Sequence, residues 1–105
     1  MITEYDEKSD ALYVRLSSKK VYSTVELSSN VAVDVNANGN PAGVELLSAS
    51  KVISDLFNKR ISRKKVGELL CSIREKDLVY LDFELDGEHA SLAIQKAYKS
   101  PVLSS

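Results

Sequence analysis

The sequence predicts an α+β fold: a five-stranded antiparallel β-meander, two helices packed on one face of it, and a C-terminal β-hairpin. Two observations lead to this prediction. Segments in the first half and near the end of the 105-residue chain alternate apolar and polar residues with the period of two typical of half-buried strands, whereas the middle has apolar residues at helical spacing. Two dipeptides typical of tight hairpin turns, Asn38-Gly39 and Asp86-Gly87, lie within strand-like segments. We therefore expect a single domain, with the meander in residues 1–49, the helices in 50–76 and the hairpin in 77–98.

The meander begins with strand-like segments at residues 1–5, 11–16 and 21–27, and it ends with a hairpin over residues 31–47. In the hairpin, Asn38-Gly39 predicts a type I′ turn, because both central residues of that turn take positive φ. A two-residue loop there pairs Asp34 with Gly43. One face of the hairpin is then apolar and consists of Val31, Val33, Val35, Ala42, Val44 and Leu46.

The same stretch also fits a calcium-loop pattern, Asp34-x-Asn36-x-Asn38-Gly39-x5-Glu45. A calcium loop of this kind needs a helix on each side, whereas both flanks here alternate like strands. The stretch also offers only two carboxylates, those of Asp34 and Glu45. The hairpin is therefore the preferred interpretation, and we predict no metal site and no cofactor.

Two helices are expected after the meander. Ser50 is a suitable N-cap for a helix over residues 51–57, and Ser62 for a second helix from Arg63 to about Glu75. The apolar stripe of the second helix is Val66, Leu69, Leu70 and Ile73. Cys71 lies off this stripe, which indicates packing more than thiol chemistry.

The C-terminal hairpin is expected to turn at Asp86-Gly87, another type I′ signal. This register pairs Glu84 with His89 and Leu81 with Leu92. It also places alternating apolar residues of both strands on one face. The tail, residues 100–105, is expected to fray or to dock loosely.

Several short motifs of the first half resemble a known family. They are Tyr5-Asp6, Asp10-Ala-Leu-Tyr-Val-Arg-Leu16, Thr24-x-Glu26, Val33-Asp34, Gly39 and Gly43-Val-Glu-Leu-Leu-Ser-Ala-Ser50. Together they are similar to the small prokaryotic family catalogued as domain of unknown function 2283. The resemblance spans residues 1–50 and implies a small β-rich domain with no assigned activity. Members usually have a more acidic turn where this chain has Asn36 and Asn38, which makes a metal site less plausible still.

Composition restricts the class of protein. No apolar run approaches the roughly 20 residues of a membrane-spanning helix, so no membrane partner is expected. A single cysteine excludes an internal disulfide, and the acidic start lacks the features of a signal peptide. A cytoplasmic protein is the resulting expectation. The net charge is −1, but residues 51–76 hold eight basic and three acidic residues, so the basic charge gathers in the middle of the chain.

This basic segment is the first candidate site, and it could bind an anion or nucleic acid through Lys59, Arg60, Arg63, Lys64 and Lys65. The start of a helix exposes free N–H groups that suit phosphate. Acidic flanks and the lack of aromatic residues among these cations weigh against nucleic acid. The alternatives are a solvated helix end or a contact with an acidic partner.

Two sets of residues on predicted sheet faces are further candidates. Glu84 and His89, with Asp82 diagonal to them, could ligate a metal or act as acid and base, although a cross-strand ion pair is the commoner explanation. The polar face of the meander displays Tyr13, Arg15, Glu26, Asp34 and Glu45. These residues form either a structural network or, through a carboxylate pair, a small hydrolytic site.

No phosphate-binding loop, nucleophile elbow or zinc-protease motif appears in the sequence. We therefore expect a non-catalytic protein-interaction module, for example an antitoxin-like or regulatory partner of another small protein. Open sheet edges make a homodimer a reasonable expectation. The alternatives are a nucleic-acid-binding protein that uses residues 59–65, and a small hydrolase that uses Asp34 and Glu45 in a concave pocket.

Overall fold

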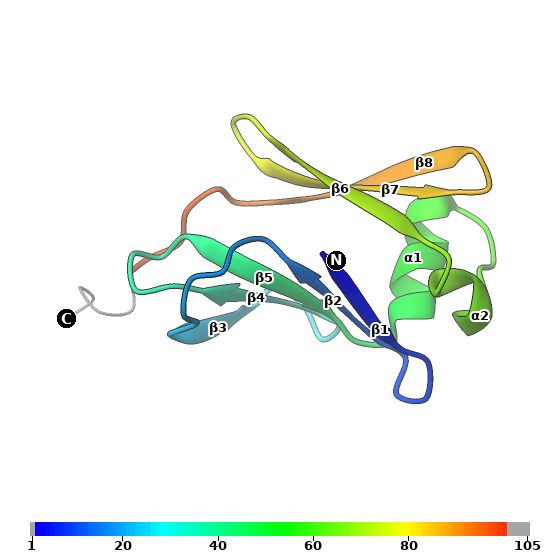
Figure 1. Ribbon diagram of the computed structural model, residues 1–105, viewed down its shortest axis with the longest axis horizontal. Coiled ribbons are helices and arrows are strands. Elements are labelled where there is room, and N and C mark those ends of the chain that lie inside the picture. The colour runs from blue at the N-terminus through cyan, green and yellow to red at the C-terminus, as the bar shows by residue number, and fades with distance from the viewer. Residues whose placement is uncertain (1, 101–105) are drawn as a thin grey trace.

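The structure is a computed structural model, and it describes residues 2–100. Figure 1 shows two antiparallel sheets stacked one over the other. Sheet A contains β1 (Thr3–Asp6), β2 (Ala11–Arg15), β3 (Ser23–Glu26), β4 (Val31–Val35) and β5 (Pro41–Leu46). Two helices follow, α1 (Ala49–Phe57) and α2 (Arg63–Val66). Sheet B contains β6 (Leu70–Glu75), β7 (Val79–Leu85) and β8 (Glu88–Ile94).

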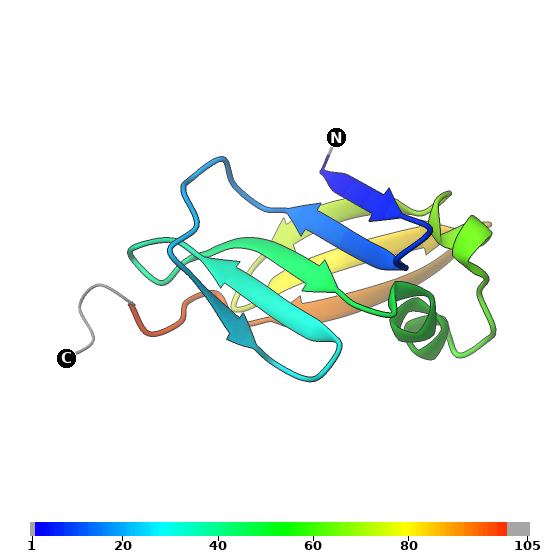
Figure 2. The same ribbon diagram turned by 90° about the horizontal axis from the view of Figure 1, so that it is seen from below.

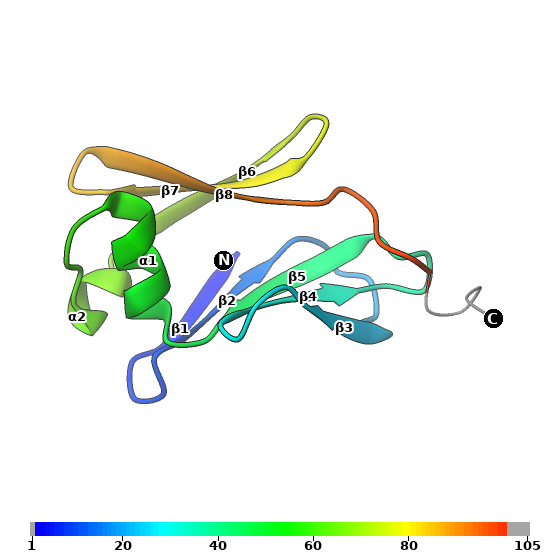
Figure 3. The ribbon, with the colours of Figure 1, turned by 180° about the vertical axis from the view of Figure 1, so that it is seen from behind.

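Sheet B and the helices cover the same face of sheet A (Figures 1 and 3). The helices lie at one end of the layer between the sheets. The fully buried side chains of this layer include Leu12, Val33 and Val44 of sheet A, Phe83 of β7 and Ile53 of α1. They belong to one apolar cluster, so the α+β class, the five-stranded antiparallel sheet, the two helices and the C-terminal hairpin are all confirmed.

The strands of sheet A lie in the order β1-β2-β5-β4-β3 (Figure 2). Strands β3, β4 and β5 are neighbours in chain order, as in a meander, but β5 rather than β3 pairs with β2. The polar segment between β2 and β3, residues 16–22, makes this possible because it is long enough to cross the end of the sheet. The result is the strand order of a Greek key, and β1 and β3 become the two edges.

The hairpin of β4 and β5 has the predicted register, with Asp34 opposite Gly43. Its turn differs from the predicted type I′ turn. The Asn36 N–H donates to the Asn40 carbonyl, so the loop has three residues, and within it only Gly39 has positive φ. The carbonyl oxygen of the Asn36 side chain accepts the N–H groups of Asn38 and Asn40 at 2.9 and 3.1 Å. These bonds stabilise the longer loop, and a β-bulge beside Val35 absorbs the extra residue.

The C-terminal hairpin is confirmed in both register and turn. Glu84 lies opposite His89 and Leu81 opposite Leu92. Both Asp86 and Gly87 have positive φ, as a type I′ turn requires.

The second predicted helix is much shorter than expected. Ser62 does cap it, but α2 ends at Val66, and residues 70–75 form β6 along the edge of β7. Gly67 lies within the predicted helix and weakens it, and β7 would otherwise lack a neighbour on that side. Leu70 and Ile73, predicted to be buried, are 63% and 39% exposed, because on an edge strand they face the two sides of the sheet.

Among residues 2–100, no helix is long and apolar enough to cross a membrane. The predicted start of the first strand at residue 1 and the frayed tail at 101–105 lie outside the described residues. Within the described tail, the Tyr98 N–H donates to the Gly39 carbonyl at 2.7 Å, which ties the end of the chain to the β4–β5 turn.

Candidate functional site

A buried carboxylate joins three parts of the fold. Asp10 lies in the turn after β1, in the left-handed region at φ 54°, and is 5% exposed. Its carboxylate accepts the Tyr5 hydroxyl at 2.6 Å, the Ser50 N–H at 3.0 Å and the Ser50 hydroxyl at 2.6 Å. The Arg63 guanidinium lies 3.7 Å away. We call Tyr5, Asp10, Ser50 and Arg63 the Asp10 clasp.

The Asp10 clasp corrects the prediction for the start of α1. Ser50 is not the N-cap, because the helix begins at Ala49 and the preceding residue makes no side-chain cap. Asp10 caps the helix instead, since its backbone carbonyl accepts the Ala49 N–H and its side chain accepts that of Ser50. Burial raises the pKa of Asp10, but the hydrogen bonds from Ser50 and Tyr5 and the charge of Arg63 outweigh it, so the pKa lies below its usual value. The clasp is therefore a structural site that holds an ionised carboxylate.

The outer face of sheet A carries the predicted polar residues. The Tyr13 hydroxyl donates to Asp34 at 3.2 Å, and the Thr24 hydroxyl donates to the other oxygen of Asp34 at 2.7 Å. Tyr13 reaches across β5 because Gly43 has no side chain: a Cβ there would lie 1.9 Å from the tyrosine hydroxyl. Burial and the charge of Asp34 raise the pKa of Tyr13, which keeps its hydroxyl protonated.

The other predicted members of this face do not complete a network. Arg15 lies over the Tyr13 ring at 5.7 Å and is 3.8 Å from Glu4, not beside Asp34 or Glu45. Glu45 lies opposite Tyr13, and Glu26 opposite Ala32, in the register of the sheet. Four clefts in the described part of the chain include neither Asp34 nor Glu45. The arrangement is a flat surface, and it lacks the concave pocket that the hydrolase hypothesis requires.

The basic segment is spread over several contacts within the chain. Lys59 pairs with Glu88, and Lys65 lies 3.2 Å from Asp86. Arg63 binds Asp10 in the clasp and donates to the carbonyls of residues 7 and 8. Arg60 and Lys64 are exposed and have no ion-pair partner among residues 2–100. Nucleic-acid binding by the segment stays a prediction, with these two residues as the available cations.

The outer face of sheet B holds the third candidate group. His89 Nδ1 lies 3.8 Å from Glu84, as the register predicted, but Asp82 binds Arg74 in a bidentate pair at 2.9 and 3.1 Å and also accepts the Ser91 hydroxyl. These bonds hold the pKa of Asp82 below its usual value. No metal-binding group of three His, Cys, Asp or Glu residues occurs in the described range 2–100.

Cys71, on the neighbouring strand β6, is half-buried against the core. Burial and the charge of Asp82 raise its pKa to about 11. The thiol is thus protonated at neutral pH, which favours the predicted packing role over a reactive one.

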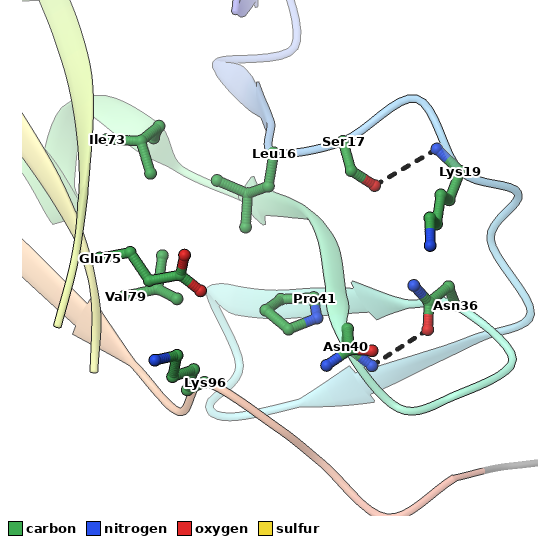
Figure 4. Close-up of a pocket in the computed structure, with 10 residues that line it drawn as sticks. All are labelled: Leu16, Ser17, Lys19, Asn36, Asn40, Pro41, Ile73, Glu75, Val79 and Lys96. Carbon is green, nitrogen blue, oxygen red and sulfur yellow. Dashed lines mark hydrogen bonds between the residues drawn. The ribbon is translucent and has the colours of Figure 1, made fainter. Parts of the chain in front are cut away.

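A cleft that the sequence did not predict opens between the two sheets, at the end remote from the helices (Figure 4). Its volume is about 520 Å³, within the range of small-molecule pockets. Leu16 and Pro41 of sheet A and Ile73 and Val79 of sheet B form apolar walls, and Lys19 and Asn36 lie on its polar side. These residues come from distant segments, so no local motif could have indicated the cleft.

Edge strand β3 is a second feature that only the strand order shows. Its outer edge has no neighbouring strand among residues 2–100. Most exposed large apolar residues in that range lie on or next to the edge strands β1, β3 and β6, and three of the seven flank β3. They are Val21, Tyr22 and Leu27. Apolar side chains beside free backbone groups are typical of a strand that pairs with another chain.

Comparison with known proteins agrees with the resemblance of the first half. A family model described as "Protein of unknown function (DUF2283)" matches residues 2–50. The chain is also similar to the uncharacterized protein MJ0789 of Methanocaldococcus jannaschii, with 31% identity over 86 residues, which covers 78% of this chain and 69% of the relative. This second similarity extends beyond residue 50 and so includes part of the helices and sheet B. No solved structure matches the chain. Three residues of the Asp10 clasp, Tyr5, Asp10 and Ser50, lie within the segment that the family model matches. From these two similarities, the chain belongs to the DUF2283 family of proteins of unknown function.

Proposed function

We propose that this protein is a non-catalytic protein-interaction module that pairs its edge strand β3 with a strand of another chain, in the first place with β3 of a second copy. The observation that carries the proposal is the open edge of β3 with exposed apolar residues on both flanks. Tyr22, the most exposed of them, is 57% accessible. A partner strand would cover these side chains and satisfy the free backbone groups in one step.

The direction of the backbone groups of β3 supports this pairing. The Leu27 N–H donates to Val31 of β4, and hydrogen-bonding residues alternate along an antiparallel strand. Val25 therefore directs its backbone groups toward β4, whereas Thr24 and Glu26 direct theirs toward solvent. Two N–H and two carbonyl groups are available for a partner strand at this edge.

The edge is also self-complementary. In an antiparallel pair of two copies centred on Val25, each Thr24 lies opposite the partner's Glu26. Like charges do not face each other in this register, and the two Val25 side chains meet on the inner face. Strand β1 is less suitable because Glu4 and Asp6 leave it acidic on its outer side, and acidic edges repel a second copy.

Replacing Glu26 by proline tests the proposal. Proline removes an N–H that points away from β4, so β3 itself keeps its bonds within the sheet. We expect the wild type to sediment at twice the chain mass of 11.6 kDa and E26P to sediment as a monomer with an unchanged circular dichroism spectrum. E26A is the matched control, since it loses the same side chain but keeps the N–H, and it should remain dimeric.

Two results would contradict the proposal at different points. A wild type that stays monomeric at high micromolar concentration would exclude the second copy as the partner. An E26P variant that is as dimeric as E26A would exclude the β3 edge as the interface. The circular dichroism spectrum shows whether E26P is folded, so a loss of the dimer can be distinguished from a loss of the fold.

A regulatory or antitoxin-like role is the version of this function that we favour, because an open edge strand with exposed apolar flanks can also pair with a strand of another small protein. The cytoplasm is the compartment that we favour, because the single cysteine of the chain is a free thiol.

A further inference from the structure

We propose that the cleft between the two sheets binds a small amphipathic carboxylate, whose apolar part lies between the sheets and whose carboxylate meets Asn36 and Lys19. This inference does not depend on pairing through β3, because the residues that line the cleft lie outside that strand. The basic segment, the polar face of sheet A and the Glu84–His89 pair contribute no residue to the lining of this cleft.

The apolar part of the proposed ligand is inferred from the walls of the cleft. Leu16 and Pro41 approach from sheet A, and Ile73 and Val79 from sheet B (Figure 4). Ile73 is 39% exposed although it lies on the inner face of its sheet. An apolar chain in the cleft would remove this surface from water, which favours binding.

The polar part is inferred from a side-chain donor that is open to solvent on the lining of the cleft. Asn36 is 6% exposed, and its side-chain oxygen is identified by the two backbone N–H groups that it accepts. Its amide nitrogen, Nδ2, has no hydrogen-bond acceptor among the described residues 2–100. In residues 2–100 no fully buried side-chain nitrogen or oxygen lacks a partner, so Nδ2 is open to solvent and available to an acceptor on a ligand in the cleft.

Lys19 supplies a charge next to that donor. Figure 4 shows its ammonium group directed toward Asn36, and no carboxylate within residues 2–100 forms an ion pair with it. The acid of the cleft, Glu75, lies on the opposite side with Lys96, which donates to the carbonyl of residue 76. An amide N–H and an ammonium group side by side favour an anionic acceptor over a cation.

A titration with octanoate, followed by amide chemical shifts and by calorimetry, tests the site. We expect saturable binding that shifts the amides of Leu16 and Ile73. N36D keeps the oxygen that holds the turn but replaces the donor by a negative charge, so octanoate affinity should fall about tenfold or more. K19Q should weaken binding several-fold. K51Q, a change of the same kind on the exposed face of α1, should have no effect.

The apolar wall and the carboxylate are tested separately. I73N should lower the affinity for octanoate, whereas L70N, on the same strand but on the outer face of sheet B, should leave it unchanged. Octan-1-ol should bind more weakly than octanoate to the wild type and equally to wild type and N36D. The absence of saturable shifts with octanoate, or equal affinity of wild type and N36D for it, would overturn the proposal. A dimer-deficient E26P that binds octanoate normally would show that this site and the β3 interface are independent.

Discussion

Sheet A contains two tyrosine–aspartate pairs, one on each face. On the inner face, Tyr5 donates to Asp10 at 2.6 Å, and on the outer face, Tyr13 donates to Asp34 at 3.2 Å. Both pairs lie within the segment that the family model matches. Asp10 is buried and also binds Ser50, forty residues later, whereas Asp34 lies at the surface and otherwise binds only Thr24 of the neighbouring strand.

The difference shows that the same pair of residues can serve two purposes. Asp10 joins the β1–β2 turn to the start of α1 and to Arg63 before sheet B, so it fixes how the sheets and helices meet. Asp34 only orients two side chains on the outer face, because the backbone pairing of β3, β4 and β5 already fixes the positions of these strands. The energetic consequences should differ accordingly, because a hydrogen bond to a buried charge stabilises more than one that water can replace.

The largest effect is expected for Asp10→Ala. The change leaves the Ser50 N–H and the Arg63 guanidinium without the carboxylate that binds them. It also places alanine in the left-handed region, where alanine has no polar side chain to stabilise that backbone conformation. We expect the free energy of unfolding to fall by about 2–4 kcal/mol, measured by urea denaturation. Asp10→Asn is the control, since asparagine tolerates the same φ, and it should lose less. Equal losses for both variants would mean that the negative charge, which both variants lack, is responsible, and not the left-handed backbone conformation.

The second prediction concerns acid. The pKa of Asp10 in the folded protein lies below its ordinary value of 3.8, so its stabilising contribution is complete above that value and disappears as the pH falls through the lower folded pKa. The difference in free energy of unfolding between wild type and Asp10→Asn should therefore be largest near neutral pH and shrink below about pH 4. Denaturation curves at a series of pH values measure it. A difference that does not change with pH would exclude an ionised Asp10.

The smallest effect is expected for Asp34→Ala. It removes the acceptor of Tyr13 and Thr24, but Thr24 is exposed and Tyr13 and Asp34 are only partly buried, so the loss should be about 1 kcal/mol or less. Thermal unfolding compared with Thr24→Ala, which removes one of the two bonds, measures the effect. A loss as large as that of Asp10→Ala would mean that the outer face is as important to the fold as the clasp.

The clasp explains the role of three positions that carry the family resemblance. Tyr5, Asp10 and Ser50 appear in the sequence as separate motifs, and Ser50 is where the matched segment ends. In the structure they form one clasp around a buried carboxylate. At these positions, therefore, the resemblance reflects how the fold is held together more than a chemical activity.

Part of the molecule could be predicted because local patterns decide it. The registers of both hairpins follow from alternation and turn position, and Asp86-Gly87 adopts the expected turn because both residues readily take positive φ. The polar face was predicted in composition, but the sequence did not indicate that Arg15 pairs with Glu4, since a long side chain has several possible partners that only its three-dimensional neighbours define.

The sequence by itself thus determined the strands other than β6, the faces of their side chains and the class of fold, because period-two alternation and turn residues act within a few positions. Tertiary structure decided the rest. It turned residues 70–75 into a strand because β7 needed a neighbour, placed β5 between β2 and β4, and brought Asp10 to the start of α1. The cleft and the open edge of β3 also depend on tertiary structure. The cleft forms where segments distant in the chain come together, and the edge of β3 is open because no other strand of the described residues lies beside it.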